Sequence, residues 1–203
     1  MRSLLNLRTL GLLAATVMLS AAQANASVIF TLQEINGYPV MTGSGTLDLT
    51  GMTQTVHTFS IDPRMGSQTF FLVGAKGQTF QEWDGPITGP DVIGPGDFHE
   101  LAADSGTGDL FGLAFAGPNK SLALPLNYIS GQSLSGTATY GFHLTAIGSI
   151  VTPGTYVWTL GNGDTITLNA IDPNPTVPEP TTFALVATGV LGLAGRRRRG
   201  QPS

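Results

Sequence analysis

The sequence contains no cysteine among its 203 residues, and only 11% of its residues are charged. The absence of cysteine excludes a disulfide scaffold and a zinc-cysteine protein. An ordinary soluble domain carries about 25% charged residues, and coiled coils carry more, so the low charge excludes a coiled coil.

Basic residues are scarce in the middle of the chain. Between Ser27 and Pro180 the only ones are Arg64, Lys76 and Lys120, against all 13 acidic residues of the chain. Nucleic-acid binders need a basic face, so we expect no nucleic-acid partner. Such an acidic segment also repels anionic membrane surfaces and suits cations as partners.

The first 26 residues have the three parts of a secretory signal peptide. Met1–Arg8 is basic, Thr9–Ser20 is apolar, and Ala24 and Ala26 form an A-x-A cleavage site. We therefore expect export through the general secretory translocon, cleavage after Ala26, and a mature chain that begins at Ser27. An uncleaved membrane anchor would need a longer apolar stretch.

The last 31 residues are predicted to form a second sorting device. Residues 173–180 are rich in proline, as in an extended linker. Residues 181–195 carry no charge and would span about 22 Å as a helix, short of the roughly 30 Å of a bilayer core. Arg196, Arg197, Arg198 and Arg199 follow as a stop-transfer signal. We expect a transmembrane helix in 181–203 with the arginines in the cytoplasm.

Val177, Pro178, Glu179 and Pro180, followed by the apolar stretch and the four arginines, resemble a PEP-CTERM sorting signal. The resemblance implies a Gram-negative bacterium and recognition of the Pro-Glu-Pro motif by an exosortase-type membrane enzyme. It also implies transient anchoring in the inner membrane and delivery to the cell envelope or extracellular matrix. The tail module is also known as an ice-binding protein C-terminal domain, a label that describes the tail alone.

Residues 27–172 are predicted to form one all-β domain. Apolar and polar residues alternate with period two in 28–33, 46–49, 57–61 and 79–83, and glycine and proline interrupt the chain too often for long helices. This pattern predicts an antiparallel β sandwich, with a jelly-roll-like fold or a barrel as alternatives.

The last hairpin of this domain has the clearest pattern. Tyr156, Trp158 and Leu160 share one strand face, and Ile166, Leu168 and Ala170 continue it. Residues 161–164 supply the turn, because the pair Asn162-Gly163 favours the positive φ angles of a tight hairpin. We expect Trp158 in the core and the domain to end just before the linker.

Threonine and serine recur in short motifs, which bear on ice binding. Thr-x-Thr occurs at 53, 137 and 165, and Ser-Gly-Thr occurs at 44, 105 and 135. Ice-binding surfaces need a regular threonine array, but the irregular spacing of these motifs excludes a solenoid repeat.

Seven acidic residues lie within residues 82–109, which contain no Lys or Arg. A flexible loop with several carboxylates suits Ca²⁺, which accepts six to eight oxygen ligands. The alternative is an acidic loop that only keeps the protein soluble. The candidate ligands for a weak calcium site are Asp84, Asp91, Asp97, Glu100, Asp104 and Asp109; no other cofactor is expected.

The sequence contains no recognisable catalytic motif. His99-Glu100 begins like a zincin helix, but the second histidine of that motif is missing because residue 103 is alanine. We therefore expect a non-enzymatic surface or matrix protein. A polysaccharide- or ice-binding module is the alternative, exopolysaccharide then being a partner, and a hydrolase using Asp97 and Glu100 is a third interpretation.

Overall fold

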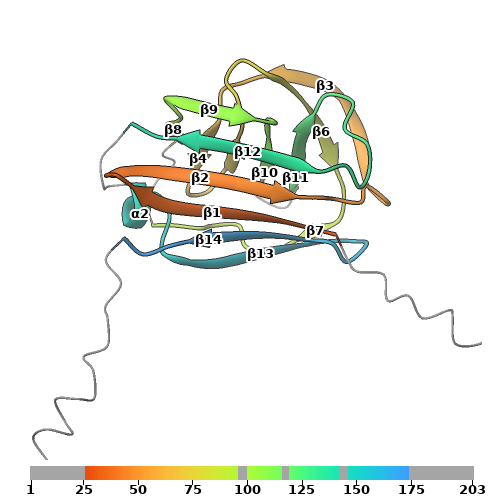
Figure 1. Ribbon diagram of the computed structural model, residues 1–203. Coiled ribbons are helices and arrows are strands. Elements are labelled where there is room, and N and C mark those ends of the chain that lie inside the picture. Colours follow the sequence, from red (N-terminus) through yellow and green to blue (C-terminus); the bar gives the residue numbers. More distant parts are fainter. Residues whose placement is uncertain (1–25, 96–99, 116–118, 142–145, 174–203) are drawn as a thin grey trace, which may run out of the picture. The chain divides into compact units, whose positions relative to one another are not determined.

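The computed structural model describes residues 26–95, 100–115, 119–141 and 146–173. The chain divides into two units, Met1–Asp172 and Pro173–Ser203. The described residues of the first unit form fourteen strands and one short helical turn, α2 (Ala146–Ser149). The strands form two separate seven-stranded sheets, which confirms the predicted β sandwich (Figure 1).

The first sheet has the strand order β7-β13-β14-β1-β2-β12-β9. Figure 1 shows five of these strands, β12, β2, β1, β14 and β13, side by side in one layer. Their bounds are β7 (Ile87–Thr88), β13 (Gly154–Leu160), β14 (Thr165–Ala170), β1 (Ser27–Ile35), β2 (Tyr38–Gly45), β12 (Leu134–Thr139) and β9 (Ser105–Gly108).

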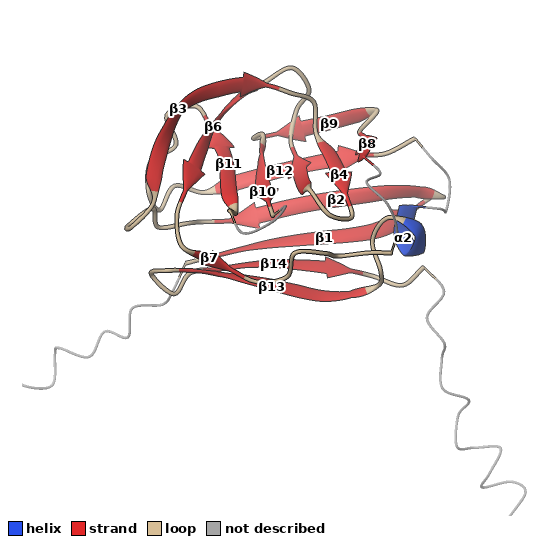
Figure 2. Ribbon diagram, turned by 180° about the vertical axis from the view of Figure 1, so that it is seen from behind, coloured by secondary structure: helices blue, strands red, loops and turns tan. Residues whose placement is uncertain are grey.

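The second sheet has the strand order β3-β6-β11-β10-β5-β4-β8. Figure 2, which shows the molecule from behind, gives the view of this sheet. Its pairs are all antiparallel, and β3 carries an irregularity between Gln54 and Thr58 where it pairs with β6. Its strands are β3 (Thr53–Ser60), β6 (Thr79–Asp84), β11 (Ser121–Pro125), β10 (Phe111–Ala114), β5 (Phe70–Val73), β4 (Arg64–Gly66) and β8 (Glu100–Ala102).

One strand pair departs from the predicted antiparallel arrangement. The first strand, β1, pairs in parallel with the last strand, β14, from Ser27 opposite Thr165 to Leu32 opposite Ala170. Short hairpin loops force neighbouring strands to run antiparallel. No such loop joins these two strands, which lie at opposite ends of the domain's sequence, so that constraint does not apply to them.

Aromatic side chains fill the space between the sheets. Trp158 of β13 is fully buried, and its ring centroid lies 5.5 Å from that of Phe71 and 5.6 Å from that of Phe115. Phe30 of β1 packs edge-on against Phe71 at 4.8 Å. Trp158 also donates a hydrogen bond from Nε1 to the carbonyl oxygen of Pro90, at 2.9 Å. The prediction that Trp158 lies in the core is confirmed.

The hairpin of β13 and β14 forms with five of the six predicted residues buried and Tyr156 only partly buried, and one backbone angle of its turn differs from the prediction. Only Gly163 has a positive φ, of 94°, whereas Asn162 does not. The Asn162 side chain instead donates a hydrogen bond to the carbonyl oxygen of Asp48, at 2.7 Å. The turn lies at residues 161–164 as predicted and is closed by a hydrogen bond from the Gly163 N–H to the carbonyl oxygen of Leu160, at 2.9 Å; only the φ of Asn162 differs from the expectation.

The prediction of a strand at residues 46–49 is wrong. Leu47 and Leu49 are buried, but this segment belongs to no ladder. Its backbone N–H groups are bound by side chains: Leu47 donates to Tyr128 Oη at 3.0 Å, Asp48 to Asp164 Oδ2 at 2.7 Å, and Leu49 to Ser130 Oγ at 2.8 Å. Side-chain oxygens thus accept the hydrogen bonds that a neighbouring strand would otherwise accept from these backbone N–H groups.

Candidate functional site

The outer face of the first sheet carries mainly threonine and serine. Residues that alternate with the buried ones along each strand point away from the core. We call this set the threonine face; it comprises Thr88, Ser105, Thr107, Ser27, Ile29, Thr31, Gln33, Ile35, Tyr38, Val40, Thr42, Ser44, Ser135, Thr137, Thr139, Thr155, Val157, Thr159, Thr165, Thr167 and Asn169.

Strand register aligns these side chains in ranks that cross the sheet. The central rank crosses six strands and consists, in order, of Thr155, Asn169, Thr31, Thr42, Thr137 and Thr107. Two hydrogen bonds run along this rank. Thr107 Oγ1 and Thr137 Oγ1 lie 2.9 Å apart, and Thr155 Oγ1 donates to Asn169 Oδ1 at 3.0 Å.

The next rank is parallel to the central one. It consists, in order, of Val157, Thr167, Ile29, Ser44 and Ser135. None of the side chains of the threonine face is charged. The face is therefore a neutral surface of hydroxyl and methyl groups on a chain whose exported part is strongly acidic.

The three Ser-Gly-Thr motifs lie on three consecutive strands of this sheet, β2, β12 and β9. Register places Ser44 opposite Ser135 and Thr137 opposite Thr107, a proximity that comes from strand pairing and not from a sequence repeat. The glycines of two motifs are required by close packing beneath the face. A Cβ atom at Gly106 would lie 2.0 Å from the carbonyl oxygen of Gly74, and one at Gly136 would lie 2.5 Å from that of Asp109.

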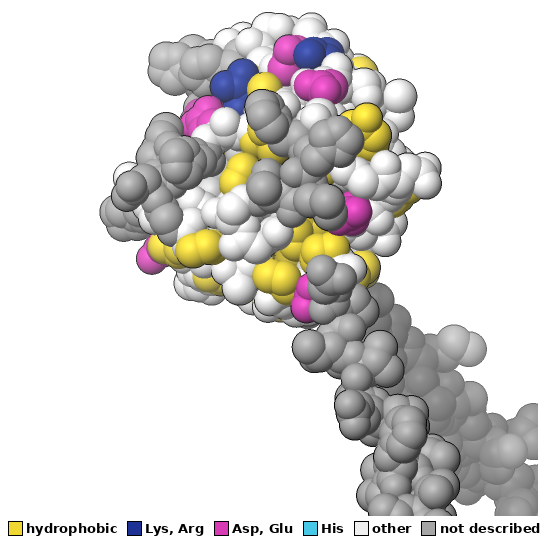
Figure 3. Space-filling view, turned by 90° about the vertical axis from the view of Figure 1, so that its left-hand side faces the viewer, with side chains coloured by type: hydrophobic (Ala, Val, Ile, Leu, Met, Phe, Trp, Pro, Cys, Tyr) yellow, Lys and Arg dark blue, Asp and Glu magenta, His cyan; other side chains and the backbone are white. Residues whose placement is uncertain are grey.

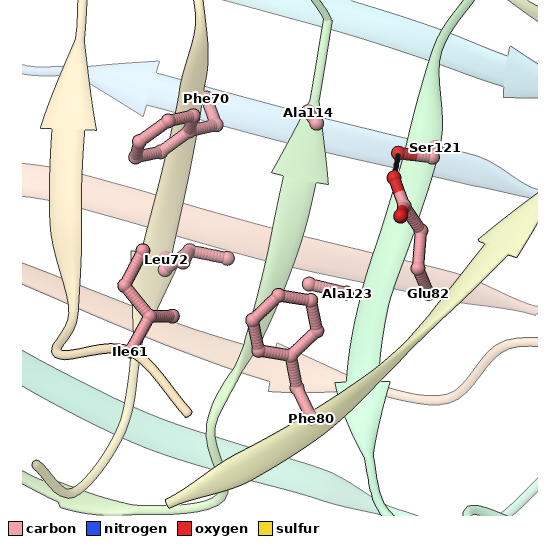
Figure 4. A pocket seen from close by; sticks show the side chains of 8 residues that line it. All are labelled: Ile61, Phe70, Leu72, Phe80, Glu82, Ala114, Ser121 and Ala123. Atoms are coloured by element: carbon pink, nitrogen blue, oxygen red, sulfur yellow. Dashed lines mark hydrogen bonds between the residues drawn. The ribbon is translucent and has the colours of Figure 1, made fainter. Parts of the chain in front are cut away.

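The outer face of the second sheet holds a shallow hollow of about 260 Å³ (Figure 4). Its lining is apolar except for Glu82 and Ser121, and the Ser121 hydroxyl donates to Glu82 Oε1 at 2.5 Å. Trp83, on the neighbouring position of β6, packs partly buried against the main core. The apolar lining residues are Ile61, Phe70, Leu72, Phe80, Ala114 and Ala123.

The acidic stretch obtains its cations from distant parts of the chain. Lys120 Nζ lies 2.5 Å from Asp91 Oδ1, and Arg64 Nη1 lies 3.4 Å from Glu100 Oε2. In the view of Figure 3, basic side chains likewise lie next to acidic ones. Two of the seven acidic residues, Asp91 and Glu100, are therefore compensated by cations from outside residues 82–109.

The remaining described candidates for a calcium site have separate roles. Asp109 Oδ2 accepts the N–H of Ser135 at 3.0 Å, Asp84 ends β6, and the Asp104 carboxylate lies against Gly141. No three acidic or histidine side chains come together to hold a metal ion within the described ranges. Asp97 lies outside those ranges. The calcium site therefore stays a hypothesis, tested by whether Ca²⁺ raises the melting temperature.

Asp48 and Asp164 belong to a polar cluster at one edge of the domain. Hydrogen bonds from Ser130 and then Thr50 lower the pKa of Asp48 below its usual value. Burial raises the pKa of Tyr128, whose hydroxyl lies next to Leu47 in the same cluster. These bonds hold the segment 46–49 in place and leave the cluster with a structural role.

The sorting and processing residues lie mostly outside the described ranges. Val177, Pro178, Glu179, Pro180, the four arginines 196–199 and the cleavage-site residue Ala24 all do so. Ala26 and Ser27 are described: the carbonyl oxygen of Ala26 accepts the N–H of Thr165 at 3.2 Å, and Ser27 begins β1. No helix in the described residues is long and apolar enough to cross a membrane, and the predicted span, 181–195, is not among them.

Comparison with known proteins identifies the C-terminal end. Residues 176–199 match the PEP-CTERM protein-sorting motif. Searches of curated proteins and of solved structures found no match. The match confirms the resemblance and supports an exported protein that is processed by an exosortase.

Proposed function

We propose that this chain, which carries a PEP-CTERM sorting motif at residues 176–199, is a non-enzymatic protein of the cell surface or extracellular matrix. The motif is the observation that carries the proposal. In this proposal the signal peptide directs the chain to the translocon, and translocation pauses at Arg196–Arg199, because moving four arginines across the bilayer costs too much.

The pause would leave Pro178, Glu179 and Pro180 just outside the membrane. Proline restricts this segment to extended conformations, which lowers the entropy lost when a peptide-binding cleft recognises it. An exosortase-type enzyme then removes residues 181–203, and the β sandwich moves to the envelope or matrix.

Replacing the motif tests this proposal. Changing Pro178, Glu179 and Pro180 to alanine is expected to trap the full-length chain in the inner membrane, and deletion of the enzyme is expected to do the same. Pro175→Ala is the matched control, because it removes a proline of the same linker but leaves the motif intact. Mass spectrometry of the extracellular form would contradict the proposal if Arg196–Arg199 were still present.

Cleavage of the signal peptide is tested separately, at the N-terminus. Sequencing of the extracellular form is expected to begin at Ser27, since Ala24 and Ala26 give the small residues that signal peptidase needs. An intact Met1 on exported material would contradict cleavage there. This result does not depend on how the tail is processed.

A second candidate function is binding of a polysaccharide or of ice by the exported domain. The threonine face favours it, because this broad neutral surface lies on the outside of the sheet and takes no part in the core. Incubation with a glycan array and with ice distinguishes these ligands, and a zymogram on exopolysaccharide tests the absence of hydrolase activity.

A further inference from the structure

We infer that the threonine face is an ice-binding surface, centred on the rank that contains Thr31, Thr42 and Thr137. This inference deepens the second candidate function and rests on it. It is independent of how the C-terminal tail is processed.

The spacing of the face is the first argument. Neighbouring strands lie about 4.8 Å apart, and successive outward residues of one strand lie about 6.7 Å apart. The central rank and the rank through Ile29 and Ser44 therefore form a two-dimensional lattice of hydroxyl and methyl groups. Ice presents a fixed lattice of water oxygens with repeats of similar length in two directions.

The chemistry of the face is the second argument. A protein partner would have to remove water from many hydroxyl groups, each of which costs free energy unless it finds a new hydrogen bond. Ice is itself water, so the hydroxyls of Thr31, Thr42 and Thr137 need not be dehydrated but join its lattice. The absence of charge on the face matters for the same reason, because charged side chains hold water in an order of their own.

A polysaccharide fits this face less well. Sugar rings are bound through aromatic side chains and a few convergent polar groups in a concave site. The one aromatic residue of the threonine face, Tyr38, lies at its end, opposite Ile35. The hollow that is lined by Phe70 and Phe80 lies on the second sheet and not on the threonine face.

The rigidity of the face is the third argument. Threonine has few side-chain rotamers because it is β-branched, and the bond between Thr107 and Thr137 fixes two of them. Little entropy is therefore lost when the face meets a rigid lattice. Strands twist by about 20–25° relative to their neighbours, so the flattest part is the centre, over β14, β1, β2 and β12.

The experiment measures how the protein partitions between slowly grown ice and the remaining liquid. The full chain is kept in solution with a non-ionic detergent. Ile29→Lys and Thr137→Lys place a charge on the face, and Ile29 tolerates the change because it is 48% exposed. Ile129→Lys is the matched control, since Ile129 is 71% exposed but lies outside the face, between β11 and β12.

The unmodified chain and Ile129→Lys are expected to be incorporated into the ice, whereas Ile29→Lys and Thr137→Lys are expected to be excluded into the liquid. Circular dichroism checks that every variant keeps the fold. Exclusion of the unmodified chain, or equal incorporation of Ile29→Lys and Ile129→Lys, would overturn the inference.

A glycan array with the same variants separates this inference from the function on which it rests. Binding of a neutral polysaccharide that is lost in Ile29→Lys, without incorporation into ice, would overturn ice binding and retain the second candidate function. Absence of both kinds of binding would overturn the two together. Neither result bears on the sorting proposal, which is measured on the processed tail.

Discussion

The buried carboxylate of Asp164 accepts a hydrogen bond from the backbone N–H of Ala26 at 2.9 Å, although 138 positions separate the two residues. Its other oxygen accepts the N–H of Asp48 at 2.7 Å. Asp164 is only 3% exposed, and within the described residues no Lys or Arg forms an ion pair with it. The last hairpin thereby holds the start of β1 and the segment 46–49 through two backbone amides.

In the chain that still carries Ala26, Asp164→Ala is expected to lower the free energy of unfolding by about 3 kcal/mol, because hydrogen bonds to charged groups are strong and two donors lose their acceptor. After cleavage behind Ala26 only the bond from Asp48 remains, so a loss of about 2 kcal/mol is expected. Urea denaturation monitored by circular dichroism measures this change. Asp164→Asn is the control, with a smaller loss, because the amide keeps one acceptor oxygen. Equal stability of all three proteins would show that water replaces the carboxylate.

Trp158→Ala is expected to cost about 3–5 kcal/mol of stability. The side chain is fully buried between Phe71 and Phe115, and the surroundings cannot close the cavity. Trp158→Phe keeps most of the volume but loses the bond from Nε1 to Pro90, so a smaller loss is expected. A melting temperature unchanged by the alanine variant would contradict the position of Trp158 in the core.

Stability is expected to fall above about pH 10, the ordinary pKa of tyrosine. Burial raises the pKa of Tyr140 far above that value, and burial also raises the pKa of Tyr128 and Tyr156. The unfolded chain then loses these protons near pH 10 while the folded chain retains them, so alkali favours unfolding. Below about pH 9 these tyrosines give no pH dependence, because they are protonated in both states.

Tyr140→Phe provides the comparison for this pH dependence. The variant removes the most strongly shifted group, so its free energy of unfolding should fall less steeply between pH 9 and about pH 11. Denaturant titrations at several pH values measure the slope. Identical slopes for the variant and the unmodified chain would show that Tyr140 does not contribute.

Local patterns predicted the fold best where neighbouring residues decide the structure. The hairpin around Trp158 followed from alternation within twenty residues. The segment with Leu47 and Leu49 alternates in the same way, yet its backbone binds the side chains of Tyr128, Asp164 and Ser130. No local pattern reveals such partners, because they lie more than 80 residues away in the chain.

The threonine face could not be predicted for the same reason. Ser-Gly-Thr at 44, 105 and 135 was visible in the sequence, but alignment on β2, β12 and β9 depends on strand order and register. The ion pair between Lys120 and Asp91 was missed for the same reason. Conversely, the sorting motif was predicted completely, because it is a linear motif that is visible in the sequence without the fold.

The position of β14 determines when the domain is able to finish folding. Among the described strands this one is the last to be synthesised, yet it lies between β13 and β1 inside the first sheet. Until the chain has been made as far as Ala170, β1 has no partner on the side that β14 occupies, and the aromatic core remains open. Such long-range pairing folds slowly. The topology therefore postpones closure of the core until the chain has been made almost to the linker before the sorting motif.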